Sequence, residues 1–162
     1  MLIRPLDPAA DRAVVEGFFQ EAADYTRLER DADPDASVTA DYFTEAPPGI
    51  DPATSLRLGL FDGAMIGIAE MSFGYPTATD AYLGLLIIVP SARGSGAGKH
   101  LLRHLEALAV KRSATHIYLG VLDANPRGHA FWTREGFTMA LPNRSVTIGG
   151  KTQLAHRLVK KL

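Results

Sequence analysis

One segment of this 162-residue sequence carries most of the information about its fold: Leu86-Ile87-Ile88-Val89-Pro90-Ser91-Ala92-Arg93-Gly94-Ser95-Gly96-Ala97-Gly98-Lys99. The apolar run before the proline has the length of a buried strand, and the proline ends it. After the glycines, leucines at helical spacing predict an amphipathic helix. A glycine-rich loop between a strand and a helix is typical of an anion site, because glycines let the backbone approach closely and the helix N-terminus adds positive potential.

Two common phosphate-binding motifs do not match this loop. A nucleotide P-loop requires Gly-x-x-x-x-Gly-Lys-Ser/Thr, so Gly98-Lys99 would need a glycine at position 93 and a hydroxyl at position 100. Those positions hold arginine and histidine. A dinucleotide fingerprint that starts at Gly94 and Gly96 would need a third glycine at position 99, which is lysine. A turn without any ligand is the remaining structural alternative.

The pattern around this segment predicts an α+β (α/β) fold with a mixed sheet, because short strands outnumber helices and the middle runs strand, loop, helix, strand. Helices are expected for about 20 residues after Asp7-Pro8, from Thr39 to Pro47-Pro48, after the glycine loop, and from Asn125-Pro126 to Gly136. Strands are expected at Leu2–Arg4, Leu56–Phe61, Ala64–Phe73, Tyr82–Val89 and His116–Leu122, with a last hairpin over Val146–Leu158.

Charge divides the chain into two halves. The whole chain has 17 Lys+Arg and 18 Asp+Glu, a net charge of −1, which argues against a generic nucleic-acid-binding protein. Residues 1–92 hold 15 acidic and 5 basic side chains, whereas residues 93–162 hold 3 acidic and 12 basic ones. The halves are therefore expected to face different partners.

Length and composition limit the remaining classes. A chain of 162 residues with 46% hydrophobic residues predicts one globular domain over residues 1–162. The chain has no cysteine, which excludes disulfides and a cysteine nucleophile. No apolar run is long enough to span a membrane, and the first residues do not resemble a signal peptide, so a cytoplasmic protein is expected.

Two motifs follow one another in the chain: Arg93-x-x-Gly96-x-Gly98 and Asn125-x-x-x-x-Ala130-Phe131-Trp132-x-x-x-Gly136-Phe137. Both resemble motifs of the GNAT N-acetyltransferase superfamily. Arg93-x-x-Gly96-x-Gly98 is similar to the family signature Arg/Gln-x-x-Gly-x-Gly/Ala, with the preceding strand and Pro90 where the family has them. Asn125-x-x-x-x-Ala130-Phe131-Trp132-x-x-x-Gly136-Phe137 is similar to the second motif of the family, about 30 residues later. The opening Ile3-Arg4-Pro5-Leu6 also resembles the family, so the likeness covers nearly the whole chain. It implies a mostly antiparallel central sheet with flanking helices.

The resemblance implies acetyl-coenzyme A as the acetyl donor, bound between two splayed parallel strands. It assigns the pyrophosphate to the loop that begins at Arg93, through the backbone amides of Gly94, Ser95, Gly96, Ala97, Gly98 and Lys99. The pantetheine arm would pair with the backbone of Leu86, Ile87 and Ile88, and Asn125, Ala130 and Phe131 would contact it. Asn125 also has the position of a helix N-cap, and both roles stay open.

Direct attack of an amine on the thioester needs a base more than an acid. Deprotonating an alkyl ammonium costs about 4.6 kcal/mol at pH 7, while releasing a thiolate costs only about 2 kcal/mol. The usual catalytic groups of the family are absent here. Trp132 stands where many members have a tyrosine acid, Gly84 and its neighbours stand where a strand glutamate is common, and Gly120 stands where others have an acid.

Other side chains are therefore candidates for these roles. Glu70, an acid in an apolar strand, is the best candidate for the base, although the exposed face of an edge strand would also explain it. Tyr82 or Tyr118 could protonate the thiolate, and the resemblance makes the Ile88 N–H the expected oxyanion donor. His100 and His104 have a metal-compatible spacing but no third ligand nearby, so no metal is expected.

The acceptor is expected to be a small-molecule amine. By resemblance, the acidic segment 21–54 forms the lip of the acceptor site, where carboxylates would attract a cationic amine, although a solvated helix face explains them equally well. Two alternatives stay open: a coenzyme A-binding module that has lost catalysis, and a protein or peptide acetyltransferase. Neither nucleic acid nor a membrane is expected as a partner, and a homodimer stays open.

Overall fold

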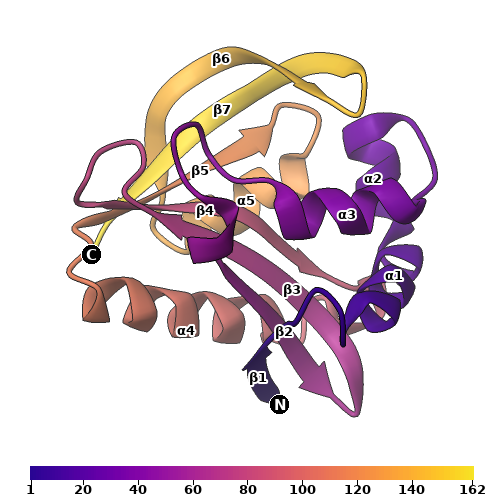
Figure 1. The fold of residues 1–162 in the computed structure, drawn as a ribbon. Helices are drawn as coiled ribbons and strands as arrows, with labels where there is room; N and C mark the ends of the chain where they lie inside the picture. Colours follow the sequence, from indigo (N-terminus) through magenta and orange to yellow (C-terminus); the bar gives the residue numbers. More distant parts are fainter.

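A computed structural model describes residues 1–162, in which one seven-stranded sheet runs between two layers of helices (Figure 1). The strand order is β1-β2-β3-β4-β5-β7-β6, and every neighbouring pair is antiparallel except β4 with β5. This arrangement confirms the α+β class and the mixed, mostly antiparallel sheet. The strands are β1 (Leu2–Pro5), β2 (Leu56–Asp62), β3 (Ala64–Phe73), β4 (Asp80–Ile88), β5 (His116–Leu122), β6 (Thr138–Ile148) and β7 (Lys151–Lys161).

Helices cover both faces of the sheet because its inner strands are apolar on both sides. Side chains alternate between two cores: Ile68 and Ile87 pack with α1 and α3, whereas Ala69 and Ile88 belong to the core that contains α4. None of the helices is long and apolar enough to cross a membrane. The helices are α1 (Arg12–Glu21), α2 (Ala23–Arg30), α3 (Ala36–Thr44), α4 (Ala97–Lys111) and α5 (Pro126–Arg134), with 3-10 turns at Pro52–Thr54 and Pro90–Ala92.

The N-terminal helices differ from the prediction at their boundaries. Asp7 Oδ1 accepts hydrogen bonds from the N–H groups of Ala9 and Ala10, which closes a turn, and α1 begins only at Arg12. The chain then breaks at Ala22, so the single predicted helix is two. Helical periodicity continues across that break, and for this reason the pattern of apolar residues does not reveal it.

Three other boundaries also move. Helix α3 begins at Ala36 rather than Thr39, because the Asp35 carboxylate accepts from the Ser37 N–H at 2.9 Å and caps the helix. Strand β4 begins at Asp80, which is buried, rather than at Tyr82. The C-terminal hairpin is longer than predicted at both ends, and its second strand, β7, pairs with β5.

The two parallel strands β4 and β5 separate along their length. They pair only from Asp80 opposite His116 to Leu83 opposite Leu119. Opposite Glu70 of β3, the register of β4 shifts by one residue at Gly84, which is a β-bulge. Beyond this point β4 and β5 diverge, and the gap between them positions the functional site.

Candidate active site

The glycine loop presents a row of free backbone donors at the start of α4. Gly94 and Gly96 have positive φ values of 80° and 90°, a conformation that glycine adopts without strain. The first hydrogen bond inside the helix is His100 N–H to Gly96 O, so the amides before it have no helical partner. Five N–H groups are without any hydrogen bond: those of Gly94, Ser95, Gly96, Gly98 and Lys99.

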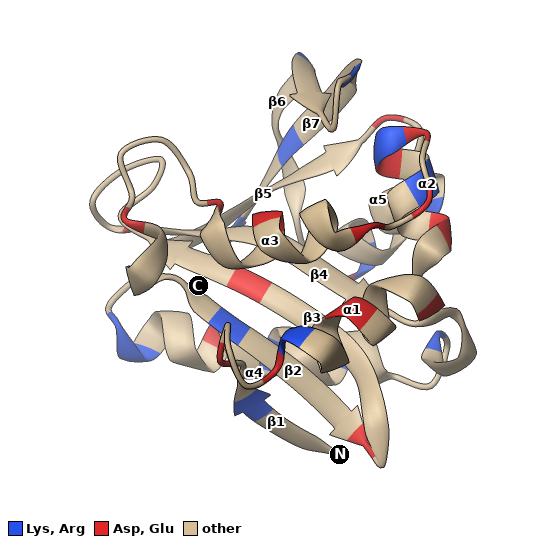
Figure 2. Cartoon of the chain, turned by 45° about the vertical axis from the view of Figure 1, so that its right-hand side comes forward, with Lys and Arg blue, Asp and Glu red and all other residues tan.

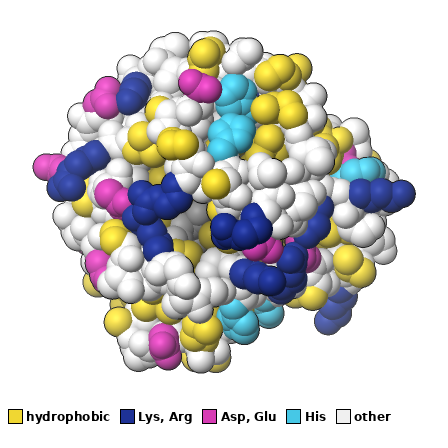
Figure 3. Space-filling view, turned by 180° about the vertical axis from the view of Figure 1, so that it is seen from behind, with side chains coloured by type: hydrophobic (Ala, Val, Ile, Leu, Met, Phe, Trp, Pro, Cys, Tyr) yellow, Lys and Arg dark blue, Asp and Glu magenta, His cyan; other side chains and the backbone are white.

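Four of these residues, Gly94, Gly96, Gly98 and Lys99, line a cavity of about 1050 Å³, hereafter the donor cavity, which lies between β4, β5, the loop and α5. Figure 3 shows Lys and Arg side chains on both sides of a hollow in this face of the molecule. Donors and cations together make the cavity suited to a polyanion. The basic residues that line it are Arg93, Lys99, Arg103, Arg127 and Arg134.

The divergent end of β4 offers further free backbone groups to this cavity. Val89 N–H donates to Ile66 O of β3 at 3.0 Å. Because successive N–H groups of a strand point to opposite sides, those of Ile88 and Leu86 point away from β3 and into the gap. Leu86, Ile87 and Ile88, predicted from the resemblance, all line the donor cavity.

The Arg93 side chain is already occupied within the protein. Its Nε donates to Ile88 O at 2.9 Å, and its terminal nitrogens pair with both carboxylate oxygens of Asp24 at 2.5 and 3.0 Å. This pair holds the pKa of Asp24 below its usual value. Arg93 thus fixes the loop to β4 and to α2. In this arrangement its guanidinium has no free edge for a phosphate.

Two residues of the predicted loop lie outside the cavity lining. Ser95 Oγ donates to Ala92 O at 2.7 Å, and the Ala97 N–H lies 3.4 Å from Ser95 Oγ. Ala97 is buried against the core. The other predicted donor-site residues, Gly94, Gly96, Gly98, Lys99, Asn125, Ala130 and Phe131, all line the donor cavity.

Asn125 can combine its two predicted roles. Its Oδ1 caps α5 by accepting from the Gly128 N–H at 2.9 Å. A side chain at Gly128 would collide with the Asn125 amide at 2.5 Å, so glycine is required there. The Asn125 Nδ2 group has no partner and remains free for a ligand in the cavity.

Trp132, in the position of the usual tyrosine acid, belongs to the core. It is 8% exposed and packs edge-on against Phe131 and Phe137, at 4.8 and 5.3 Å between ring centroids. Tyr82 of β4 reaches toward β5 instead, and its Oη lies 3.4 Å from where a Cβ of Gly120 would be. Tyr118 is the neighbour of Tyr82 across the β4–β5 pair.

Glu70 is buried in the middle of β3, with 7% of its surface exposed. The expectation that it might lie on an exposed edge is wrong, because β3 pairs with β2 on one side and β4 on the other. Figure 2 shows acidic residues in red on the helices in front of the sheet, and one acidic segment within the sheet, in β3. Burial raises the pKa of Glu70, although the hydrogen bond from Ser72 Oγ, 2.6 Å from Oε1, opposes the rise.

The bulge at Gly84 makes room for the Glu70 carboxylate. A Cβ on Gly84 would lie 2.1 Å from Glu70 Oε2, so the carboxylate occupies the space of a side chain at position 84. Oε2 has no hydrogen-bond partner, and no cation pairs with Glu70. The nearby Arg57 donates to three backbone carbonyls instead, those of Tyr42, Glu45 and Pro52. A carboxylate thus stands at the position where the family commonly has a strand glutamate.

A second cavity of about 170 Å³, hereafter the acceptor cavity, lies beside Glu70 between the sheet and α2–α3. It shares four lining residues with the donor cavity, and one of them is Gly84, against which the Glu70 carboxylate lies. Four carboxylates line it, against the single guanidinium of Arg30. Burial raises the pKa of two of them, Glu29 and Glu45, as it does that of Glu70.

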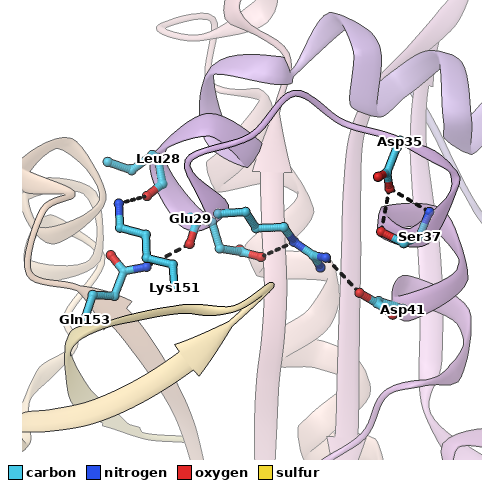
Figure 4. A network of polar contacts seen from close by, with 8 residues as sticks. Leu28, Glu29, Asp35, Ser37, Asp41, Lys151 and Gln153 are labelled. Atoms are coloured by element: carbon cyan, nitrogen blue, oxygen red, sulfur yellow. Dashed lines mark hydrogen bonds and ion pairs between the residues drawn. The ribbon is translucent and has the colours of Figure 1, made fainter.

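The β6–β7 hairpin lies beside this cavity, which Ile148 of β6 lines, and Figure 4 shows the polar contacts of the hairpin with α2. Lys151 Nζ donates to Leu28 O at 3.2 Å and pairs with Asp31 at 2.7 Å. Gln153 Nε2 donates to Glu29 O at 2.8 Å, so the hairpin satisfies carbonyls at the end of α2. Next to this contact, Arg30 pairs with Glu29 and Asp41 at 3.3 and 2.8 Å.

Sequence reasoning missed the partners that complete the site. Nothing local links Gly84 with Glu70, or the hairpin with α2, because these contacts arise from sheet register and tertiary packing. The glycine at position 84 was a signal that could have been used, since it leaves space inside a buried strand. His100 and His104 are exposed on α4, and no group of three side chains that could hold a metal occurs in residues 1–162.

Comparisons with known proteins agree with this geometry. The acetyltransferase (GNAT) family model matches residues 16–137. An uncharacterized N-acetyltransferase of Mycobacterium tuberculosis is 26% identical over 132 residues, covering 82% of this chain and 79% of that protein. An acetyltransferase from Thermus thermophilus has a similar structure, with a TM-score of 0.74, 26% identity and coverage of 100% and 98%. The ribosomal-protein-S18-alanine N-acetyltransferase of Escherichia coli shares the fold, with a TM-score of 0.70, 18% identity and coverage of 99% and 92%. The chain therefore belongs to the GNAT family of acetyltransferases and is an N-acetyltransferase.

Proposed function

We propose that residues 1–162 form one domain that transfers an acetyl group from acetyl-CoA directly to a primary amine of a small cationic molecule. The GNAT family implies acetyl-CoA as the donor. The observation that carries the proposal is the Glu70 carboxylate, buried, without a cation and placed in the bulge of β4 between the two cavities. A base at this position lies in the acceptor cavity and beside Gly84, which also lines the donor cavity.

Glu70 is the proposed general base. Its carboxylate is desolvated, and a pKa raised above the usual value makes it a better proton acceptor. It takes a proton from the acceptor ammonium, directly or through water, and the neutral amine attacks the thioester carbonyl. The Ser72 hydroxyl holds the other carboxylate oxygen in place.

The donor side supports the remaining steps. The free N–H of Ile88 points into the gap and is the proposed donor to the developing oxyanion. As the carbon–sulfur bond breaks, the electron pair passes to sulfur, and Tyr82 is the proposed donor of the proton to the thiolate. The free amides of the loop hold the pyrophosphate, and Asn125 Nδ2 is available to the pantetheine arm.

The acceptor cavity favours a small cation over a protein segment. Its volume of about 170 Å³ is below the roughly 300 Å³ at which drug-sized ligand sites begin. Its excess of carboxylates attracts ammonium groups. The hairpin held on α2 narrows the access that an extended peptide would need.

The test is a panel of acceptors assayed by release of the free thiol of coenzyme A. The panel holds small amines with and without a second positive charge, amino acids, and peptides with free N-termini. We expect turnover with small cationic amines and a KM for them that rises with salt concentration. Turnover only with peptides would favour a protein acetyltransferase, and coenzyme A binding without turnover would favour a module that lost catalysis.

Glu70→Gln tests the catalytic assignment in the same assay. Removing a general base is expected to lower kcat by about 100-fold or more, with little change in the affinity for coenzyme A. Asp62→Asn is the matched control, because Asp62 is exposed at the β2–β3 turn and pairs with no cation. Full activity of Glu70→Gln across the pH range would remove this assignment.

A further inference from the structure

Arg157 is a cation near the reaction centre that has no carboxylate partner. It lies on β7 directly opposite Gly120 of β5 in the sheet register. Its terminal nitrogen donates to Tyr75 Oη at 3.0 Å, and its Nε is buried with no partner. Its guanidinium carbon lies 5.5 Å from the ring centroid of Tyr75 and 5.9 Å from that of Tyr82. An arginine held in this way does not form an ion pair; its positive charge acts on the two aromatic side chains, and its contacts hold them in place.

The same contacts fix the orientation of Tyr82. The Tyr75 and Tyr82 rings meet edge to face, with centroids 5.3 Å apart and an interplanar angle of 81°. Tyr82 Oη is thereby held 3.4 Å from the empty Cβ position of Gly120, and Gly120 lines the donor cavity. Tyr82 Oη therefore lies in contact with the space of a side chain at position 120, next to the wall of the donor cavity, although Tyr82 itself does not line that cavity.

We propose that Arg157 is a positioning residue for the acid step: it clamps Tyr82 through Tyr75, and its charge stabilises the phenolate formed when Tyr82 protonates the departing sulfur. The inference rests on the proposed function, because it assigns a helper to the acid of that reaction. A glycine lies beside each of the two groups. The Glu70 carboxylate occupies the space of a side chain at Gly84, and Tyr82 Oη lies in contact with the space of a side chain at Gly120, each from a neighbouring strand.

The proton balance of the reaction closes with these groups and water. The nitrogen of an acceptor ammonium loses two protons: Glu70 takes the first and passes it to water, which frees the neutral amine, and Glu70 takes the second from the nitrogen of the tetrahedral intermediate. Tyr82 gives its Oη proton to the sulfur as the carbon–sulfur bond breaks. The protonated Glu70 and the phenolate then return to their starting states by transfer of one proton between them, directly or through water. The products are the N-acetylated amine, the free thiol and one proton released to solvent.

Several charged or titratable groups surround Tyr82, and they act in different directions. Burial raises the pKa of the Tyr82 phenol most, and Glu70 on β3 and Tyr75 also raise it. Arg157 on β7 and Arg144 on β6 lower it, and Tyr118 is its neighbour on β5. Of the two arginines, only Arg157 has contacts with both aromatic rings.

The first test measures the phenol itself in the free protein, without an acceptor. Tyr82 is replaced by a difluorotyrosine, whose more acidic phenol titrates in an accessible pH range, and the phenolate absorbance is followed against pH. In an Arg157→Gln background the titration is expected to move to higher pH, because the cation that favours the phenolate is gone. Arg157→Lys, which keeps the charge, is expected to restore most of the shift.

The second test is a double-mutant cycle in the acetylation assay. Arg157→Gln is expected to lower kcat about tenfold, with the KM for acetyl-CoA within about twofold. In a Tyr82→Phe background the same substitution should have almost no further effect. Arg112→Gln is the matched control, because its guanidinium also lies over an aromatic ring, 4.4 Å from the Phe73 centroid, but outside this cluster.

Two results would overturn the inference. One is a phenol titration that does not move in Arg157→Gln, and the other is an equal loss of activity in the presence and absence of the Tyr82 hydroxyl. Failure of the proposed function looks different: the parent protein would acetylate no amine, while the titration of the free protein would still report whether Arg157 acts on Tyr82.

Discussion

The donor and acceptor cavities meet at Gly84, beside Glu70, yet the chain builds them in different ways. The donor cavity uses backbone groups: the free amides of four lining residues at the start of α4 and the unpaired N–H groups of β4. The acceptor cavity uses side chains and contacts from α2, α3, β3 and the distant β6–β7 hairpin. A backbone site depends on a local conformation, whereas a side-chain site depends on which segments the fold brings together.

This difference has a chemical meaning. The donor is a polyanion of fixed structure, so a fixed geometry of N–H groups and nearby cations suits it. The acceptor side has four carboxylates and one arginine, and its shape depends on a hairpin that is held by only a few polar contacts. Substitutions in the donor cavity should therefore change the affinity for coenzyme A, whereas substitutions in the acceptor cavity should change catalysis or the KM for the acceptor.

The largest effect is expected for Gly96→Glu. Gly96 has a φ of +90°, where a side chain is strained, and the new carboxylate would repel the phosphates that the free amides attract. The Kd for coenzyme A, measured by calorimetry, should rise by about 100-fold. Gly17→Glu is the matched control on the exposed face of α1, where nothing lies within 4 Å, and it should leave the Kd unchanged. Unchanged affinity in Gly96→Glu would contradict the phosphate assignment.

Gly84→Ala should damage catalysis and spare donor binding. The added Cβ would lie 2.1 Å from Glu70 Oε2, so the carboxylate must leave its place in the bulge. We expect kcat to fall by about 100-fold, as for loss of the base, while the Kd for coenzyme A changes only a few-fold. Gly17→Ala is the control for the substitution itself. If kcat stays within threefold of the parent, the position of Glu70 is not what sets the rate.

The same contrast explains how much could be predicted from the sequence. The glycine loop, the strand before it and the α5 motif were predictable, because each is a local pattern with one physical reason. The break between α1 and α2 at Ala22 could not be predicted, because the helical periodicity of apolar residues continues across it. The start of α3 could not be predicted either, because a single cap at Asp35 sets it. Glu70 was found as an acid among apolar residues, but its place in the Gly84 bulge depends on the register between β3 and β4.

A smaller effect is expected where the hairpin meets α2. Lys151→Ala removes the pairing with Asp31 and the hydrogen bond to Leu28 O, which loosens the wall of the acceptor cavity. The KM for the acceptor should rise a few-fold in steady-state assays, since exposed ion pairs contribute about 1 kcal/mol or less. The KM for acetyl-CoA should stay constant, and Lys161→Ala, at the exposed end of β7, should change neither value. An increase confined to the KM for acetyl-CoA would contradict the assignment of the hairpin to the acceptor cavity.

The smallest effect concerns stability. Burial raises the pKa of Glu70 in the folded state, so its protonated form favours folding and this contribution is lost as the pH rises through the folded-state pKa. Glu70→Gln should therefore have a Tm slightly higher than the parent at pH 8 and a similar Tm below the ordinary glutamate pKa. Thermal unfolding followed by circular dichroism across this pH range measures the difference. A variant that is less stable than the parent at pH 8 would show that the ionised carboxylate is well accommodated.

Relocating the carboxylate tests most directly whether a base at the Gly84 bulge drives the reaction. Glu70→Ala removes the base from β3, and Gly84→Glu in the same chain supplies one from β4, with its Cβ where Glu70 Oε2 now lies. The account predicts that Glu70→Ala lowers kcat by about 100-fold or more and that the double variant recovers at least about tenfold of this loss. Full activity in Glu70→Ala, or a double variant no more active than Glu70→Ala with its affinity for coenzyme A intact, would contradict it.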